Sequence, residues 1–365
     1  MNTSCIGLRR HILRTGFACV AVTVASLTLT PAVAQERKVS KVLDFTTAAD
    51  VAKAEAEGTF VFYTHDSEPA AAALMEAFNK DFPKIKGTYV RAQTGALYSK
   101  ILAERSAGRY LADVVQFSEL TTGQDFAAKG GYANYVSPES AAYSADKLSK
   151  PAGSFFWVGV GFAGIAYNTE KVKPEDAPKT WKDLLNPKFA NGISVKQSTS
   201  GMQFVQWAEL RRLYGDSFWT SFSKQRPKGF DSRAQLFDRL GKGDDKVIGM
   251  AEYQGFVLQK AKGSPIAFVA PPDGLTAGPN VQGVADKAPH PEAARLFVDW
   301  MMSLRGQTFM QNNKFLLYGS VRKDAPAMPD GTRLNDFKLL IPSDPVALKA
   351  SHDTFKKTWN GMLGL

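Results

Sequence analysis

A run of small hydroxyl-bearing residues lies where an apolar segment gives way to a helical pattern. Residues 193–195 are strand-forming, and the apolar residues after position 203 recur at helical spacing. Hydroxyl groups and a glycine at such a junction leave backbone N–H groups where the helix dipole favours negative charge, and Lys196 adds a positive charge. The same residues are typical of an ordinary helix N-cap. We therefore expect either an anion-binding loop or a simple cap at Ser198, Thr199, Ser200 and Gly201.

A second pattern with chemical meaning is the glycine-rich stretch at residues 159–164, which fits the G-x-G-x-x-G spacing of dinucleotide-binding loops. Such a loop works only when its last glycine opens a helix that holds the pyrophosphate. Residues 165–169 instead continue as extended sequence. We interpret these glycines as positions where strands pack closely against their neighbours.

Catalytic signatures are missing from the sequence. The motifs of common hydrolases, metalloproteases and P-loop proteins do not occur, and the four histidines are scattered. His65 follows a strand-forming segment beside Asp66, so it lines either a cleft or a solvated loop. Because no nucleophile is paired with a base, we expect a binding protein and not an enzyme. An enzyme that uses Glu119 or His65 as acid or base is the alternative.

The elements that must position these residues alternate between strands and helices. Strand-like segments at 59–64, 87–91 and 112–117 are separated by helical segments at 70–81 and 97–106. This alternation is typical of parallel α/β sheets, in which ligand groups gather at the carboxyl ends of the strands. The later segments are a long strand at 155–167, further strands at 193–195, 246–250 and 265–270, and helices at 253–262, 291–302, 306–312 and 345–363. We expect Phe355 and Trp359 to pack the last helix against the core.

The N-terminal sequence is typical of a secretory signal peptide. Basic residues at positions 9–14 precede an apolar run at 17–29 and an A-x-A sequence that ends at Ala34. We expect cleavage after Ala34 and a periplasmic location. The arginine pair leaves the twin-arginine and general export routes equally open. Both cysteines, Cys5 and Cys19, lie in this segment, so the mature chain should have no disulfide and no cysteine-based metal site.

The charge balance disfavours one class of partner. Lys and Arg number 45 against 35 Asp and Glu, a formal charge of +10, but the basic residues are dispersed among acidic ones. Nucleic-acid binding is therefore not expected. A mild preference for an anionic ligand is the more useful inference.

An ordered set of short motifs resembles the family 1 extracellular solute-binding proteins of ABC importers, in particular the branch that includes ferric-iron binders. The resemblance extends from about residue 59 to residue 322. The motifs that carry it are Val61-Phe62-Tyr63, Ala112-Asp113-Val114, Ile165-Ala166-Tyr167-Asn168, Lys179-Thr180-Trp181, the residues 198–201, and His290-Pro291-Glu292. Their order and spacing, more than any single motif, support the resemblance.

The resemblance implies an α/β protein with the type II periplasmic-binding fold. Two α/β lobes with mixed sheets would be joined by hinge strands near Trp157 and Pro271 around a central cleft. Lobe 1 would comprise residues 35–157 and 272–325, and lobe 2 residues 158–271 and 326–365. The lobes would close over a solute and present it to an inner-membrane ABC permease. We expect a monomer without a cofactor.

Iron-binding relatives hold the metal with two adjacent tyrosines, often together with a histidine and a glutamate. Tyr253 matches one tyrosine, but Gln254 stands where the second would be. Glu119 matches the glutamate, while Ser67 lies closer than His65 to the place of the histidine. With one phenolate missing, the resemblance favours a small organic or phosphorylated anion. Ferric iron bound by Tyr253 and Glu119 with a neighbouring anion is the alternative.

The hydroxyl-rich junctions lead to a hypothesis for the ligand-binding residues. Neutral donors would come from Ser67, Thr94, Gly95 and residues 198–201. Tyr253 and Gln254 would supply directed hydrogen bonds and Trp157 an apolar wall, since small-ligand sites combine a few placed polar groups with apolar surface. The complete predicted set is Ser67, Thr94, Gly95, Glu119, Trp157, Ser198, Thr199, Ser200, Gly201, Tyr253 and Gln254.

Overall fold

A computed structural model describes residues 37–150 and 152–365 of the chain. Within it, Arg37–Leu365 is one compact unit. The signal peptide predicted at residues 1–34 lies outside the described residues. No helix in the described part of the chain is long and apolar enough to cross a membrane.

The first half of the fold builds three parallel strands with helices around them, as the sequence alternation predicts. Phe60 and Phe62 on the central strand are fully buried, and both rings pack on Phe297. The elements are β1 (Ser40–Val42), β2 (Phe45–Thr47), α1 (Val51–Glu57), β3 (Thr59–Thr64), α2 (Glu68–Asp81), β4 (Lys86–Arg91), α3 (Thr94–Ser106), β5 (Val114–Phe117), α4 (Leu120–Ala128), α9 (Pro291–Met302) and α10 (Leu304–Asn312).

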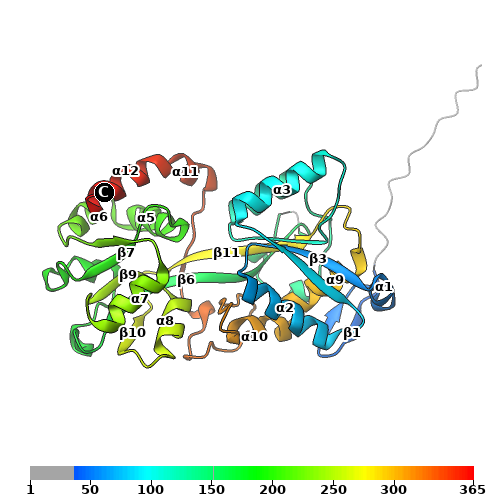
Figure 1. Cartoon of the computed structure of the whole chain (residues 1–365), viewed down its shortest axis with the longest axis horizontal. Helices are drawn as coiled ribbons and strands as arrows, with labels where there is room; N and C mark the ends of the chain where they lie inside the picture. The colour runs from blue at the N-terminus through cyan, green and yellow to red at the C-terminus, as the bar shows by residue number, and fades with distance from the viewer. Residues whose placement is uncertain (1–36, 151) are drawn as a thin grey trace, which may run out of the picture. The chain divides into compact units, whose positions relative to one another are not determined.

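Two long antiparallel strands, β6 (Phe156–Asn168) and β11 (Leu275–Val284), run from this half into the other (Figure 1). We call them the hinge strands. Gly161 of β6 pairs with Gly278 of β11. A Cβ added at Gly164 would lie 2.4 Å from the backbone oxygen of Val269. The interpretation of these glycines as close strand packing is therefore confirmed.

The second half repeats the arrangement around parallel strands of its own. Its elements are β7 (Ile193–Lys196), α5 (Gly201–Tyr214), α6 (Asp216–Ser223), β8 (Lys228–Phe230), α7 (Arg233–Lys242), β9 (Val247–Glu252), α8 (Tyr253–Lys260), β10 (Ile266–Val269), β12 (Leu339–Leu340), α11 (Pro345–Ala350) and α12 (His352–Leu363). Short 3-10 turns occupy Pro138–Ala142, Ala145–Lys147, Pro174–Asp176, Trp181–Leu185, Pro187–Phe189 and Leu334–Asp336.

All strands except β1 and β2 join one mixed sheet with the order β4-β3-β5-β11-β6-β9-β7-β8, to which β10 and β12 add at the hinge strands. In this sheet, pairing is parallel within each half. The hinge strands pair antiparallel with each other and with β5, β9 and β10, whereas β12 pairs parallel with β11. The predicted α/β class with mixed sheets is confirmed. The division into two lobes at particular residues stays a prediction, because Arg37–Leu365 is a single compact unit.

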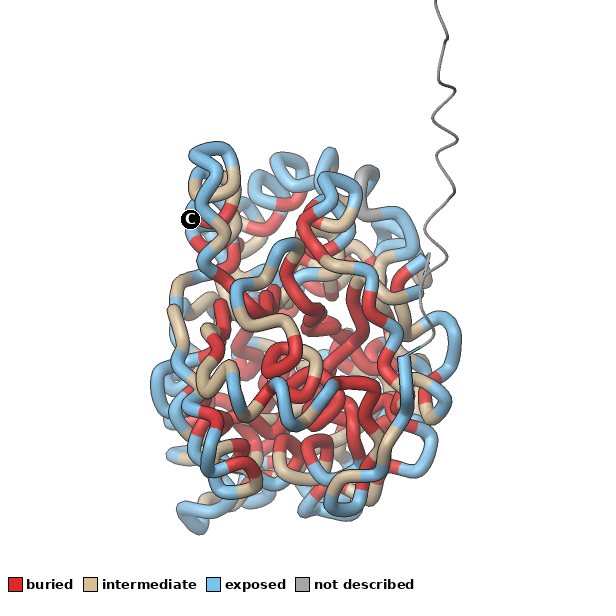
Figure 2. The backbone as a smooth tube through the Cα atoms, turned by 90° about the vertical axis from the view of Figure 1, so that its right-hand side faces the viewer, coloured by how far each residue is buried: buried red, intermediate tan, exposed pale blue. Residues whose placement is uncertain are grey.

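Buried residues line the interior, while the turns and helix faces at the periphery are exposed (Figure 2). One hydrophobic cluster belongs to the second half alone and contains Trp181, Trp207, Trp219, Phe355 and Trp359. Phe355 and Trp359 are fully buried, as predicted from the sequence. The single helix predicted at residues 345–363 is wrong in one detail, because α11 and α12 are separate helices.

Candidate ligand-binding site beside the hinge strands

Asp66, which follows β3, is the centre of a buried polar cluster. Its side chain is only 1% exposed. The Tyr318 hydroxyl donates to Asp66 Oδ1 at 2.5 Å, and Gln116 Nε2 donates to Oδ2 at 3.2 Å. Arg91 Nε donates to the Asp66 carbonyl at 3.1 Å. Three segments that are distant in sequence therefore meet at the carboxyl end of β3.

His65 belongs to the same cluster. Its Nε2 lies 3.3 Å from Gln116 Nε2, and its side chain is 12% exposed. Because an amide NH₂ group can only donate, Nε2 accepts and the ring is assigned as neutral. Burial lowers the pKa of His65, against the opposing effect of the Asp66 and Glu119 carboxylates. Of the two sequence interpretations, the solvated loop is thus wrong.

The second half contributes an ion pair to this region. Arg233, the first residue of α7, donates to Glu252 Oε2 at 3.0 Å. Its charge also acts on Tyr318: burial and the Asp66 carboxylate raise the pKa of that phenol, and Arg233 opposes the rise. Arg233 is therefore within electrostatic reach of a residue that is bonded to the first half.

The 198–201 loop has the geometry of a helix N-cap. Ser200 Oγ accepts a hydrogen bond from the Gln203 N–H at 3.3 Å, and the Ser200 N–H donates to the Gln197 carbonyl at 3.1 Å. The cap interpretation is confirmed. The cap is compatible with anion binding, because the N–H groups of Gly201 and Met202 in the first turn of α5 have no acceptor inside the helix. Thr199 and Gly201 are exposed.

The loop and the Asp66 cluster lie over the same face of β6. The Met202 methyl carbon would be 3.9 Å from a Cβ at Gly161 and 3.3 Å from one at Gly278. The Cβ of Tyr318 would be 2.8 Å from a Cβ at Gly159. Positions 159 and 161 of a strand face the same side. The start of α5 and the Tyr318 ring therefore approach the hinge strands from one side.

This face of the hinge strands also has unused hydrogen-bonding capacity. Gln116 and Gln282 stand opposite each other in register and are buried. Gln116 Oε1, both amide atoms of Gln282 and the Thr276 hydroxyl have no hydrogen-bond partner among the described residues. Asn280, between Gln282 and Gly278 on the same side of β11, interacts with His65 and Tyr318. Buried polar groups almost always find a partner, so these atoms are candidates for contact with a polar solute or with water.

Tyr253 and Gln254 are placed elsewhere. The Tyr253 ring is 1% exposed and stacks on Phe162 at a centroid distance of 4.7 Å. Phe162 alternates with Gly161, so this stack lies on the opposite face of β6 from Met202. Burial raises the pKa of Tyr253, and Asp330 raises it further. Gln254 Nε2 donates to the carbonyls of Phe315 at 2.8 Å and Leu316 at 3.2 Å.

The remaining predicted residues differ in exposure. Ser67 and Gly95 are exposed, whereas Thr94 is buried and shares a 2.8 Å hydrogen bond with Ser118. Glu119 is exposed and accepts from Thr122, and its charge reaches His65. Trp157 is buried under the Lys147 ammonium group, 4.6 Å from the ring centroid. The ligand-binding roles of all these residues stay predictions.

Sequence reasoning left several residues of this region out of the predicted set. Asp66 and His65 had a usable signal, because they follow a strand whose carboxyl end should gather ligand groups. The others come together only through the sheet and the loop after α10. They include Gln116, Arg233, Glu252, Asn280, Gln282 and Tyr318.

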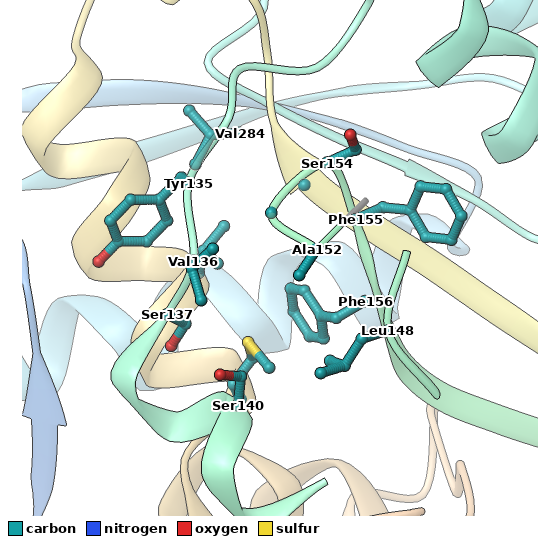
Figure 3. A pocket seen from close by; sticks show the side chains of 14 residues that line it. Tyr135, Val136, Ser137, Ser140, Leu148, Ala152, Ser154, Phe155, Phe156 and Val284 are labelled. Carbon is teal, nitrogen blue, oxygen red and sulfur yellow. The ribbon is translucent and has the colours of Figure 1, made fainter. Parts of the chain in front are cut away.

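A separate pocket in the first half is lined by Tyr135, Val136, Ser140, Leu148 and Phe156 (Figure 3). Its space of about 20 Å³ holds roughly one water molecule, too little for an organic solute. Among residues 37–150 and 152–365, no group of three His, Cys, Asp or Glu side chains is arranged to hold a metal ion.

Comparison with known proteins gives a consistent match. The family model for bacterial extracellular solute-binding proteins matches residues 111–338. An uncharacterised protein of Haemophilus influenzae is 25% identical over 267 residues, which is 70% of this chain and 75% of that protein. The periplasmic binding protein AfuA of Actinobacillus pleuropneumoniae with bound fructose-6-phosphate has a TM-score of 0.65 at 22% identity, and iron-bound HitA of Pseudomonas aeruginosa has 0.65 at 20%. Each alignment covers 84% of this chain and 99% of the other, and the likeness shows a shared fold.

Proposed function

Because the chain belongs to the family of bacterial extracellular solute-binding proteins, we propose that it binds a small anionic solute beside its hinge strands and delivers it to an ABC permease. The family and the type II periplasmic-binding fold expected from the sequence are both confirmed. The family is one of binding proteins, and we propose that the solute is released unchanged. Export to the periplasm with cleavage after Ala34 is part of the same proposal.

The observation that carries the proposal is the convergence of polar groups from both halves on one face of the hinge strands. Asp66, His65 and Tyr318 arrive from one half, and Arg233 with the 198–201 loop from the other. A solute placed there would contact both halves at once. Its binding energy would therefore favour whichever relative position of the halves brings both sets of groups into contact.

An anion is the solute class that these groups suit. The N–H groups of Gly201 and Met202, the helix dipole of α5 and the Arg233 guanidinium all favour negative charge. A phosphate or carboxylate group would compete with Glu252 for Arg233, which holds that carboxylate at 3.0 Å. The amide groups of Gln116 and Gln282 would serve the neutral polar part of the solute. The phosphorylated sugar bound by AfuA is a solute of this class.

Ferric iron as cargo is the alternative predicted from the sequence, and HitA is an iron-bound neighbour in fold. The contacts of Tyr253 support it less. To bind iron, this phenol would have to leave its stack on Phe162, and Gln254 offers an amide that already donates to two backbone carbonyls. Hard Fe(III) prefers phenolate and carboxylate oxygens over amides.

The test is native mass spectrometry with metal analysis on protein purified from its own periplasm without denaturation. The expected result is a stoichiometric small-molecule adduct without metal, on a chain that begins at Gln35. Stoichiometric iron would replace the anion proposal with the iron alternative. A chain that retains residues 1–34 would contradict the predicted export and cleavage.

A further inference from the structure

The C-terminal helix α12 contacts the strand that leads into the 198–201 loop. Trp359 is fully buried, and its indole Nε1 donates a 2.9 Å hydrogen bond to the carbonyl of Lys196. Lys196 is the last residue of β7, two positions before the loop. The donor comes from 163 positions further along the chain.

The same helix also contacts the other end of the loop. Phe204, in the first turn of α5, packs against the Phe355 ring at 5.0 Å and meets the His352 ring edge to face at 5.1 Å. Helix α12 therefore touches the strand before the loop and the helix after it. The loop residues between these two contacts are positioned relative to one rigid element.

The other restraints on the loop come from α5 and β8. The Lys196 N–H donates to Gln203 Oε1 at 3.2 Å, and the Gln197 N–H donates to the Phe230 carbonyl at 3.1 Å. The Lys196 carbonyl is oriented by Trp359. A rotation of this peptide unit would tilt the turn closed by the Ser200 N–H, and with it the N–H groups of Gly201 and Met202.

We propose that Trp359 is a positioning residue for the solute site, which acts by fixing the Lys196 peptide and hence the direction of the loop's donors. The inference rests on the proposed function, since it treats the 198–201 loop as the anion-binding part of the site. Trp359 itself contacts no solute. Its contribution is preorganisation, which raises affinity by reducing the ordering that binding requires.

The same aromatic cluster provides a matched control. Trp219 is buried, its ring lies 5.1 Å from the Trp359 ring, and its Nε1 donates to the Trp207 carbonyl at 3.0 Å. That carbonyl lies inside α5 and not at the loop. Trp219→Phe and Trp359→Phe thus each remove one indole hydrogen bond from the same core, but only Trp359→Phe removes a bond to the loop's strand.

The experiment compares the mature wild-type protein with these two variants by amide hydrogen exchange without solute, and by calorimetric titration with inorganic phosphate. Both variants should lose similar thermal stability. In Trp359→Phe, exchange at the Gln197 and Ser200 amides should accelerate and phosphate affinity should fall, each by about tenfold, the effect of one lost hydrogen bond. In Trp219→Phe both should stay within about twofold of wild type, because the hydrogen bond from Trp359 to Lys196 is left intact and a phenyl ring can still pack on the Trp359 ring.

Equal exchange at these two amides in both variants would overturn the positioning role. Wild-type protein that binds no phosphate, together with the expected exchange difference, would instead count against the anion function and leave the positioning of the loop intact. If Trp359→Phe does not fold, His352→Ala serves as the second variant, because the His352 side chain is 51% exposed. It should accelerate exchange at the Ser200 amide by about threefold, and an unchanged rate would contradict the role of α12.

Discussion

The Tyr318 hydroxyl donates a 2.5 Å hydrogen bond to Asp66, across 252 positions of sequence. The next residue, Gly319, pairs through its backbone with Val160 on β6. The loop after α10 thereby ties the carboxyl end of β3 to a hinge strand. Asp66 is held in place by this loop and not by its own half alone.

Tyr318→Phe should remove this bond while keeping the ring in place. Loss of a hydrogen bond to a buried carboxylate is expected to lower the free energy of unfolding by about 2 kcal/mol, measured by urea denaturation. Tyr89→Phe is the control, because Tyr89 donates to Glu68 at 2.8 Å on the exposed surface and its loss should matter by less than about 0.5 kcal/mol. Equal losses of unfolding free energy in the two variants would show that the Tyr318 bond stabilises the fold no more than a surface hydrogen bond does.

Ser200→Asp should weaken anion binding without unfolding the protein. Aspartate is as good an N-cap as serine and suits the helix dipole, so the thermal midpoint should stay equal or rise. The added negative charge should weaken phosphate binding by at least about tenfold. Ser217→Asp, at the exposed start of α6 in the same half, makes the same change of charge and should leave binding unaltered. Full phosphate affinity in Ser200→Asp would argue strongly against the proposed site.

Asp299 should make stability fall as the pH rises. Burial raises the pKa of this carboxyl from 3.8 to about 6, against the opposing hydrogen bonds from Ser137, Thr47 and Tyr135. Because the folded state holds the proton more tightly, this contribution is complete below pH 3.8 and is lost as the pH rises through 6. The shift corresponds to about 3 kcal/mol. Asp299→Asn should therefore gain stability relative to wild type by about that amount between pH 4 and 7.

The control for this pH dependence is Asp125→Asn. Asp125 is on the surface, and its hydrogen bond from Lys129 lowers its pKa. Its contribution is therefore lost only as the pH falls below 3.8, outside the window in which Asp299 titrates. Urea unfolding at four pH values between 4 and 7 compares the variants. Parallel curves for Asp299→Asn and wild type would mean that Asp299 titrates normally.

Gly164→Ala should strain the hinge strand β6. The new methyl group would lie 2.4 Å from the Val269 backbone oxygen, which cannot move away without disturbing the β10 pairing. We expect a loss of about 1–3 kcal/mol in the free energy of unfolding. Gly361→Ala in α12 meets no atom within 4 Å and should be neutral or slightly stabilising. A harmless Gly164→Ala would show that the two strands can separate locally.

The local patterns of the sequence predict most strands and helices, because β3, α2 and α9 each bury an apolar face of recognisable period. They do not predict β11, whose sequence contains Gly278 and Pro279. Pairing with β6 on one side and β5 on the other makes it a strand. Such pairing depends on strands that are distant in the sequence, so no short stretch of sequence predicts it.

Prediction of the site from the sequence is limited in the same way. The cap at Ser200 is a local feature and is predicted correctly. Tyr253 has the right side chain for a ligand, but the register of β6 places its ring on the Phe162 face, away from Met202. A shift of one residue in a strand exchanges its two faces. Arg233 and Tyr318 have no local signal, because only the fold brings Tyr318 to Asp66 and Arg233 within electrostatic reach of Tyr318.

The bond between Trp359 and Lys196 also has a consequence for biosynthesis. A growing chain that has just completed α5 contains the whole 198–201 loop, yet the indole that orients it is made only after a further 145 residues. Until then the loop is present but lacks the hydrogen bond that fixes its conformation. The capacity to bind solute should thus be acquired among the last steps of synthesis, and a chain truncated before α12 would carry every proposed contact residue and still bind poorly.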